Sequence, residues 1–482
     1  MKFFAPILLC AIPSLAAPSA SEDVRGSCPD LPTKKNLTTS ITTLPDPFLF
    51  SNGKRVSSQH QWNCRQKEIS QLIQDYELGA KPARPTDFSV AWDNVSKVLV
   101  VAPAVDGKKI SFNVTIKYPS TTTGAGPFPA IIAIGGASIP LPASVASITF
   151  VNDEIASQYG IQSRGKGLFY DLYGSDASAG AMIAWAWATS RIIDALEMTP
   201  DAQIDTSKIA VTGCSRNGKG ALVVGAFDKR IALTIPQESG TGGAGCWRLA
   251  DDTYSQGINI QTAHELVGEN SWCSKDFDAY ATSINLLPFD HHMLAGLVAP
   301  RGLLVIENNI NWLGPQSTYG CMKTANKIWQ ALGAQDNMGF TEIGVHSHCR
   351  FPAEQQSILS AYISQFLFDT PSNTSVMATT VASSFNETKS KRRGVHNPEF
   401  YNVGMGKLTS SFAVHCFRTN TVLDTENSTS VRATLQLKDI DTQGQGRLVE
   451  NLGNDLRTLV GADALEERST QERTGKRRWG LT

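Results

Sequence analysis

The chain is 482 residues long, which suits two or three domains or one large α/β domain with extensions. Hydrophobic residues make up 41% of it, so it can bury a substantial core. Its formal net charge of -1 gives no electrostatic basis for binding nucleic acid or an anionic membrane surface. We therefore expect a globular protein with neither of these partners.

The N-terminus has the pattern of a secretory signal peptide. Lys2 precedes the apolar run FFAPILLCAIPSLAA, and small residues follow, so residues 1–20 are predicted to be removed, with cleavage between about Ala16 and Ala20. This run is too short to span a bilayer, and no later segment is long and apolar enough. We expect a secreted, extracellular protein that is monomeric.

Cysteines in such a protein lie in an oxidising compartment. Of the nine cysteines, Cys10 would leave with the signal peptide, and the eight that remain permit full pairing without fixing it. These eight are Cys28, Cys64, Cys214, Cys246, Cys273, Cys321, Cys349 and Cys416. Sequons of the form N-x-S/T, which are compatible with a secreted glycoprotein, begin at Asn36, Asn94, Asn113, Asn373, Asn386 and Asn427.

The elements predicted along residues 21–375 indicate a catalytic domain of the α/β class. Strand-like segments run from about 87 to 118, and 129–136 (PAIIAIGG) resembles a buried central strand. Residues 179–198 have helical length and apolar spacing. Strands and helices then alternate through KIAVTG, GKGALVVGAF, IALTIPQ, RGLLVIEN, KTANKIWQAL, FTEIGVHSH and QQSILSAYISQFLF. This alternation predicts parallel βαβ units, and hence a three-layer sandwich around a mostly parallel central sheet.

The character of the sequence changes after about residue 370. Ser, Thr, Asn and charged residues dominate, and hydrophobic periodicity fades. We predict that residues 376–482 form a poorly ordered C-terminal extension, with an incorrectly predicted exon end as an alternative origin. Its single cysteine, Cys416, does not make the pattern of a disulfide-rich binding module.

Ser215 lies between a predicted strand and a predicted helix, in VTGCSRNGKG. That arrangement is typical of the nucleophile elbow of α/β-hydrolases, whose helix N-terminus offers backbone N–H groups to an oxyanion. The usual pattern is G-x-S-x-G, and Asn217 occupies the position of the second glycine. Asn tolerates a strained backbone better than most residues. The alternative is a loop serine that only caps the helix.

A nucleophilic serine needs a base and an acid, which follow it in this fold in the order acid, then histidine. His346 and His348 both come after the last predicted strand, and we favour His348 because Cys349 follows it directly. Since Cys214 directly precedes the serine, a Cys214–Cys349 disulfide would hold nucleophile and base within hydrogen-bond reach. The alternative is two unrelated structural cysteines.

Two glutamates are candidates for the acid. Glu238 follows the predicted strand IALTIPQ, and Glu307 follows RGLLVI, which is the more usual position in this fold. The pattern alone does not choose between them, and either could be a glutamate without a role. The pair His291-His292 has no surrounding ligand set at metal spacing, so we expect a structural loop there and no metal site, with Asp290 able to orient one ring.

The segment GCSRNGKG resembles the motif G-C-S-R-x-G-K-G of the fungal glucuronoyl esterases, carbohydrate esterase family fifteen. The similarity runs from about Cys28 to Asp369 and includes LPDPF, WNCRQKEI, ELGAKP, PQESG, LLPFDHHML, ENNINWLG and HSHCRFP. It implies an α/β-hydrolase fold. It also implies a serine esterase that needs no metal or organic cofactor and cleaves the ester between 4-O-methyl-glucuronic acid on xylan and an alcohol of lignin.

The resemblance also implies roles for single residues. Ser215 is then the nucleophile, His348 the base and Glu238 the acid, with Glu307 kept as a possible second or supporting carboxylate. Arg216 is the oxyanion-binding residue. The set that binds the sugar is Lys219, Gln261 and Trp312.

Other features of the family pattern leave questions open. It implies the disulfides Cys28–Cys64 and Cys246–Cys321, and leaves Cys273 and Cys416 without partners. Lys219 could instead be a solvated helix residue, and Trp312 a core residue. The rival functions are an acetylxylan or feruloyl esterase, or a catalytically silent hydrolase-like module that binds polysaccharide or another protein.

Overall fold

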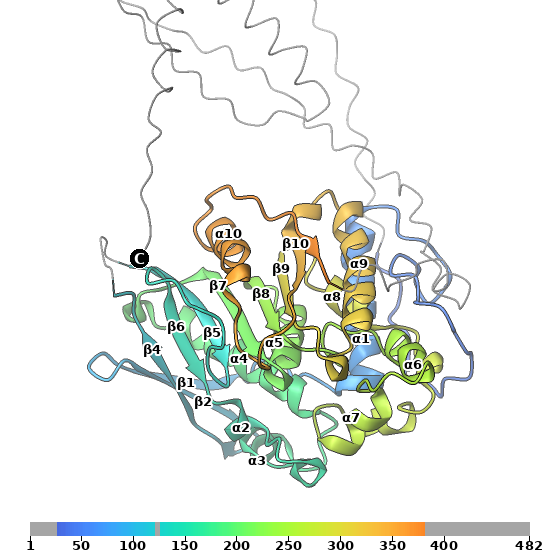
Figure 1. Cartoon of the computed structure of the whole chain (residues 1–482). Helices are drawn as coiled ribbons and strands as arrows, with labels where there is room; N and C mark the ends of the chain where they lie inside the picture. Colours follow the sequence, from blue (N-terminus) through green and yellow to red (C-terminus); the bar gives the residue numbers. More distant parts are fainter. Residues whose placement is uncertain (1–26, 121–125, 381–482) are drawn as a thin grey trace, which may run out of the picture. The chain divides into compact units, whose positions relative to one another are not determined.

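The computed structural model of the protein describes residues 27–120 and 126–380 (Figure 1). The predicted signal peptide and all but the first residues of the predicted C-terminal extension, with Cys416, lie outside the described residues. Within the described ranges, none of the helices has both the length and the apolar character that crossing a lipid bilayer requires.

One mixed sheet of eleven strands organises the described chain, in the order β1-β2-β4-β6-β5-β7-β8-β9-β10-β11, with β3 beside β2. The antiparallel part comprises β1 (Asp87–Asp93), β2 (Val98–Val105), β3 (Lys108–Lys109) and β4 (Phe112–Lys117), which pairs with β6 (Ala146–Phe150). From β6 onward all neighbours are parallel: β5 (Phe128–Ile134), β7 (Ile204–Cys214), β8 (Ile231–Gln237), β9 (Gly302–Glu307), β10 (Met338–Glu342) and β11 (Met377–Ala378). The predicted parallel core is therefore confirmed.

Helices cover both faces of this sheet, which makes the predicted three-layer sandwich. On β9, Leu303 and Val305 join one apolar cluster, whereas Leu304 and Ile306 join the other, as expected for side chains that alternate along a strand. Both faces are buried, so the parallel strands appear in the sequence as continuous apolar runs.

The two faces are covered unequally (Figure 1). On one side, α10 (Gln356–Leu367) is the helix among the described residues that packs against β7, β8 and β9. The opposite cluster takes its helical residues chiefly from α1 (Gln59–Ile73), α3 (Leu168–Tyr173), α4 (Ala181–Glu197), α5 (Arg216–Phe227), α8 (His291–Gly296) and α9 (Pro315–Ala331). The helices α2 (Asn152–Ile155), α6 (Trp247–Ser255) and α7 (Ala263–Glu269) lie in the connections.

Helix α4 is buried on all sides, since every residue except Glu197 is buried. Most of these residues are apolar, and the buried Arg191 and Asp194 are paired with each other, so the helix lies inside a large core. It packs against α5, and so helps to fix the helix that begins at the serine elbow.

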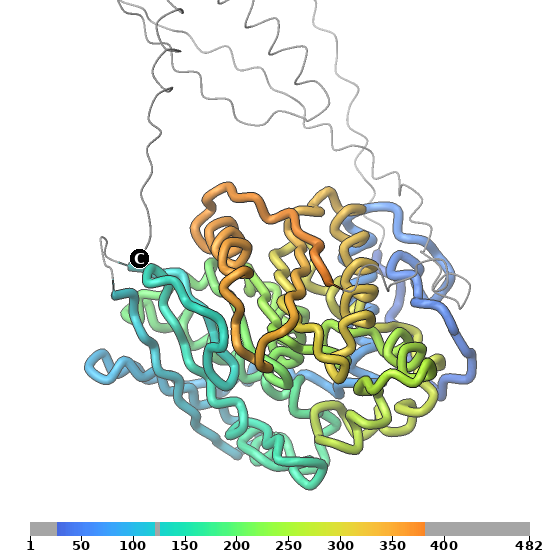
Figure 2. The backbone as a smooth tube through the Cα atoms, viewed as in Figure 1, coloured from blue at the N-terminus to red at the C-terminus, as the bar shows by residue number. Residues whose placement is uncertain are grey.

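The N-terminal part of the described chain packs against segments from its second half (Figure 2). The Ile41 amide donates to the Asn285 carbonyl over 2.7 Å, and the Gln66 side chain donates to the carbonyls of Gly296 and Ala299. The Cys28–Cys64 disulfide ties this segment to α1.

The packed structure continues past the expected domain boundary at residue 375. β11 pairs with β10, and the Thr380 amide and hydroxyl both donate to the Glu342 carboxylate. A few residues assigned to the extension are therefore part of the sheet.

Candidate active site

Ser215 lies at a sharp turn between β7 and α5. Its backbone has φ 58° and ψ -127°, a conformation that L-residues rarely adopt. The turn is held by the Ser215 amide, which donates to the Gln237 carbonyl over 2.9 Å, and by the Lys219 amide, which donates to the Ser215 carbonyl over 3.0 Å. This is the geometry of a nucleophile elbow, in which strain is confined to the serine itself.

Two glycines make this turn possible. A Cβ atom on Gly213 would lie 2.4 Å from the Asn217 carbonyl oxygen, and one on Gly218 would lie 2.5 Å from the Gln237 carbonyl oxygen. Neither position therefore accepts a side chain, because the neighbouring atoms are backbone. The close approach of strand and helix is what the glycines of the sequence motif permit.

Asn217 does not have the role predicted from the sequence, because it is an ordinary residue of α5 and its φ is not positive. Its side-chain oxygen instead accepts hydrogen bonds from Asn152 over 3.1 Å and from Gln158 over 3.3 Å. Its amide also approaches Gly135 so closely that a Cβ there would lie 2.1 Å from it. Asn217 thus joins the elbow to two other segments.

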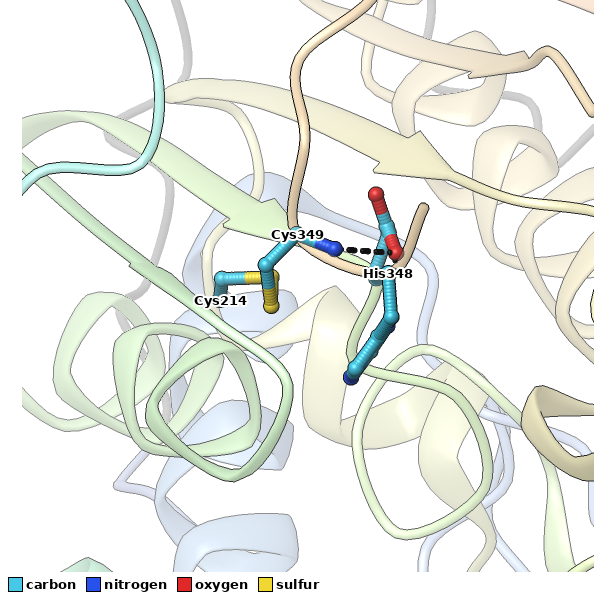
Figure 3. Close-up of side chains that lie close together, drawn as sticks. Cys214, His348 and Cys349 are labelled. Carbon is cyan, nitrogen blue, oxygen red and sulfur yellow. Dashed lines mark hydrogen bonds and ion pairs between the residues drawn. A yellow bond between two sulfur atoms is a disulfide. The ribbon is translucent and has the colours of Figure 1, made fainter. Parts of the chain in front are cut away.

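The structure contains the predicted Cys214–Cys349 disulfide, with Cα atoms 5.8 Å apart across 135 residues of sequence. Figure 3 shows His348 beside Cys349, on the loop that this bond holds against the end of β7. The disulfide therefore brings the chain segments of Ser215 and His348 together.

His348 is hydrogen-bonded to Glu238, since its Nδ1 lies 2.7 Å from Oε2 of the glutamate. The same oxygen accepts the Cys349 amide over 2.9 Å (Figure 3). Burial would raise the pKa of Glu238, but these hydrogen bonds outweigh it and hold the pKa below its ordinary value. Glu238 is thus an anion that keeps the proton of His348 on Nδ1 and leaves Nε2 as an acceptor.

His346 is bound differently. Its Nε2 contacts the Ile343 carbonyl at 2.8 Å, and its Nδ1 lies 3.8 Å from the nearer oxygen of Glu238, beyond hydrogen-bond distance. The His348 side chain is 39% exposed, whereas that of His346 is 11% exposed. Of the two histidines, the one chosen from the sequence is the one that is open to a substrate.

Glu307 is fully buried at the end of β9 and has another set of partners. Its Oε1 accepts the Ser239 amide and hydroxyl, both over 3.0 Å, and the Gly240 amide over 3.1 Å. Among the described residues, His346 and His348 both approach the carboxylate of Glu238 to within 4 Å. The two glutamates that the sequence offered as the acid therefore have different partners. Glu238 is hydrogen-bonded to His348, whereas Glu307 is hydrogen-bonded to backbone amides.

Arg216 is the first residue of α5 and is exposed. Its guanidinium lies 5.9 Å from the centre of the Trp272 ring, and the Lys219 ammonium lies 6.0 Å from the same ring. Two cations therefore face one indole beside the elbow. The first amides of α5 also have no acceptor within the helix and can receive an anion.

Lys219 and Gln261 are in contact. The buried ammonium of Lys219 donates to the carbonyls of Ser239 and Thr241 and, over 3.1 Å, to the side-chain oxygen of Gln261. The side-chain amide nitrogen of Gln261 donates in turn to the exposed Glu269 over 2.6 Å. Burial lowers the pKa of Lys219 to about 8.

Glu269 was not found from the sequence. It is the last residue of α7, in VGEN, where no motif marks it. Trp312 is 37% exposed, and its carbonyl accepts the Gln261 amide over 3.1 Å. Gln261 therefore links the polar chain from Lys219 to Glu269 with the backbone of Trp312.

The adjacent histidines begin helix α8, not the expected loop, and Asp290 caps that helix through the His291 amide. The two ring nitrogens of His291 contact Glu77 at 2.8 Å and the Gly243 carbonyl at 2.6 Å. Burial lowers the pKa of His292 to about 4. Both side chains are buried within the fold.

The remaining cysteines complete this picture. The structure contains Cys246–Cys321 as well as Cys28–Cys64, and Cys273 is buried and unpaired. Two groups of side chains among the described residues have metal-like spacing, but each includes a disulfide, whose sulfur atoms are bonded to each other and are not thiolate ligands.

The sheet and the elbow define an α/β-hydrolase fold, and comparison with known proteins identifies its family. Residues 101–333 match the family described as glucuronyl esterase, fungi. A 4-O-methyl-glucuronoyl methylesterase of Hypocrea jecorina is 56% identical over 337 residues, covering 70% of this chain and 72% of that protein. A protein of the same name from Podospora anserina is 52% identical over 369 residues, 75% of this chain and 76% of that protein.

Solved structures agree. The glucuronoyl esterase catalytic domain from Hypocrea jecorina has 55% identity and a TM-score of 0.71, covering 73% of this chain and 95% of that chain. A serine-to-alanine mutant of the Sporotrichum thermophile enzyme, in complex with methyl 4-O-methyl-beta-D-glucopyranuronate, has 47% identity and a TM-score of 0.72, covering 76% and 98%. The protein is therefore a carboxylic ester hydrolase. It belongs to the fungal glucuronyl esterase family.

Proposed function

We propose that this protein is a secreted serine esterase that hydrolyses the ester between 4-O-methyl-D-glucuronoyl groups of glucuronoxylan and alcohols of lignin. The observation that carries the proposal is the hydrogen bond between His348 and Glu238 on a loop that a disulfide holds beside Ser215. The complex of the Sporotrichum thermophile relative with a methyl glucuronate ester supports 4-O-methyl-glucuronate as the acid part of the substrate.

In the proposed mechanism, Nε2 of His348 takes the proton of Ser215 as its oxygen attacks the ester carbonyl. Glu238 stabilises the imidazolium that forms. The oxyanion is bound by Arg216 and by the first backbone N–H groups of α5. His348 then returns the proton to the departing alkoxide, and water releases the uronic acid from the acyl-enzyme in the same way.

The sugar is recognised by hydroxyl contacts, because the ester has no carboxylate charge. We assign this contact to Lys219, Gln261 and Trp312, and add Glu269, whose exposed carboxylate can accept from a hydroxyl. The three N–H groups of Lys219 already have acceptors, so a hydroxyl that binds Lys219 must replace one of them. We expect weak dependence of binding on salt.

Secretion is supported by the three disulfides of the described chain, which persist in oxidising compartments. The monomeric state and the C-terminal extension stay predictions. Size-exclusion chromatography with mass determination on the secreted protein tests both.

The experiment that tests the function compares benzyl glucuronate, its 4-O-methyl form, an acetyl ester and a feruloyl ester as substrates. We expect turnover of both uronate esters by the wild type and loss of it in Ser215→Ala. Turnover of acetyl or feruloyl esters alone would contradict the substrate but keep the ester hydrolase. A protein that hydrolyses no ester and is not labelled by a fluorophosphonate would be a silent module.

A further inference from the structure

The glycine-rich loop Ser239–Gly245 (SGTGGAG), directly after Glu238, is buried along its whole length. Buried backbone must find hydrogen-bond partners, and here titratable side chains from three different elements supply several of them. Lys219 of α5 binds two carbonyls, His291 of α8 binds the Gly243 carbonyl, and Glu307 of β9 binds amides.

Glu307 binds the start of this loop. The amides of Ser239 and Gly240 both point at its Oε1, and so does the Ser239 hydroxyl. That hydroxyl also accepts the Ala244 amide over 2.9 Å, so the contact extends to the far end of the loop. One buried oxygen atom thus organises both ends of the loop.

The turn that Glu307 holds is a strained one. Glu238 has φ 46° and Gly240 has φ 57°, so left-handed backbone occurs on both sides of Ser239. Such backbone persists at a residue with a side chain only where its surroundings fix it. The Glu238 amide is fixed by the Ile306 carbonyl at 2.6 Å, and the next two amides are fixed by Glu307.

We propose that Glu307 is a positioning residue: by binding the amides of Ser239 and Gly240, it holds the left-handed turn that directs the Glu238 carboxylate at His348. This inference rests on the proposed function. This role differs from that of a second acid. Glu307 does not bind His348 itself but holds the backbone turn next to Glu238, which does.

The charge state of Glu307 follows from its surroundings. Burial raises its pKa to about 8, which its donors only partly offset. Its second oxygen has no hydrogen-bond partner among the described residues. The charged or titratable groups around it are Lys219 from α5, Glu238 after β8, Glu342, which is paired with it in register on β10, and the two histidines bound near Glu238. Glu307 is therefore largely neutral at pH values well below its raised pKa.

A neutral acid makes a specific prediction for substitution. Glu307→Gln keeps an oxygen that can accept the same amides and has no charge to lose, so kcat should stay within a few-fold of wild type. Glu307→Ala removes the acceptor, and kcat should fall by about 10–100-fold, as for other residues that orient a catalytic group. Glu238→Gln, by contrast, should resemble loss of a triad acid.

The pH dependence separates positioning from a merely structural role. Because the folded pKa of about 8 lies above the ordinary 4.5, the folded protein keeps a proton that the unfolded chain loses. The contribution of Glu307 to stability is therefore complete below pH 4.5 and is lost as pH rises to 8. Glu307→Gln should gain in melting temperature over wild type across this range, and its kcat should lack the decline that ionisation of Glu307 causes near pH 8.

The experiment measures kcat, melting temperature and the rate of Ser215 labelling by a fluorophosphonate, from pH 4.5 to 9, for the wild type and the Glu307 variants. Glu342→Gln removes a buried carboxyl from the neighbouring strand and is the matched control, for which we expect an unchanged labelling rate. Labelling needs an activated serine but no sugar. A failure of the proposed substrate therefore leaves this test intact.

The named outcomes decide the proposal. Labelling that is kept in Glu307→Gln and slowed in Glu307→Ala supports it. If Glu307→Gln loses as much as Glu238→Gln, Glu307 acts as an acid and the proposal is overturned. It is also overturned if a folded Glu307→Ala labels at the wild-type rate. Should Glu307→Ala not fold, Glu307→Met fills the same space without a strong acceptor, and wild-type labelling by that variant would overturn the proposal.

Discussion

The ends of β8 and β9 are neighbouring parallel strand ends that carry chemically identical glutamates with opposite behaviour. Glu238 accepts hydrogen bonds from His348 and the Cys349 amide, and its pKa is lowered. Glu307 is buried against the loop backbone, and its pKa is raised to about 8. One glutamate is thus fitted to hold a proton on a histidine and the other to hold a backbone turn. Position along a sheet edge does not decide the role of a carboxyl group; its donors and its burial do.

The largest expected effect is that of Glu238→Gln, which removes the negative charge from the carboxyl group that binds His348. We expect kcat on a glucuronate ester to fall by about 10³–10⁴-fold, because the amide cannot keep the histidine in the correct tautomer. Steady-state kinetics checks this. A loss as small as that of Glu307→Gln would make the two glutamates equivalent and refute the contrast.

The next effect concerns the Cys214–Cys349 disulfide, which holds His348 next to Glu238. Replacing both cysteines by serine should lower the free energy of unfolding by about 2–4 kcal/mol and should also lower kcat. Replacing Cys28 and Cys64 by serine is the matched control, since that bond closes a shorter loop, with a sequence separation of 36 against 135, and its loss should leave kcat unchanged. Denaturant unfolding and kinetics on both variants measure this difference.

The two carboxyl groups should also differ in the direction of their pH dependence. The pKa of Glu238 is lowered in the folded protein, so its contribution to stability is present above pH 4.5 and is lost as pH falls through the folded value. The melting temperature of wild type should therefore fall below pH 4.5 more steeply than that of Glu238→Gln. Parallel curves would show that Glu238 is not held as an anion.

The smallest expected effect is at Asn308, which follows Glu307 and donates to Oε2 of Glu238 over 3.4 Å. This contact is long beside the 2.7 Å bond from His348. Asn308→Ala should cost about 0.5–1.5 kcal/mol of stability and reduce kcat only a few-fold. A loss comparable to that of Glu238→Gln would mean that Asn308, and not the turn held by Glu307, orients the acid.

Much of the parallel core could be predicted from the sequence, because both faces of its strands are buried. The segment IALTIPQ is β8 without a change of boundary, since an apolar or small run from Ile231 to Pro236 ends at the polar pair Gln237-Glu238. The adjacency of Cys214 to Ser215 and of Cys349 to His348 predicted a contact across 135 residues. A disulfide needs cysteine at both ends, so its two positions can be recognised in the sequence.

Other parts left no such pattern. Helix α1 was not predicted, because its buried face includes Arg65, Gln66 and Glu68, and the carbonyls that satisfy Gln66 come from the region around α8. The partners of Glu307 are amides of a loop that Lys219 and His291, from other parts of the chain, also bind. Partners that are remote in the chain cannot be found from local periodicity.

The open setting of His348, with 39% of its side chain exposed, has a consequence for the physical state of the material that the enzyme can attack. The proposed ester joins two polymers, so neither side of the bond has a free end that could thread into a closed tunnel. A base at the surface allows the linkage to approach from the side while both chains continue into solvent. The enzyme can then work at the face of an insoluble solid.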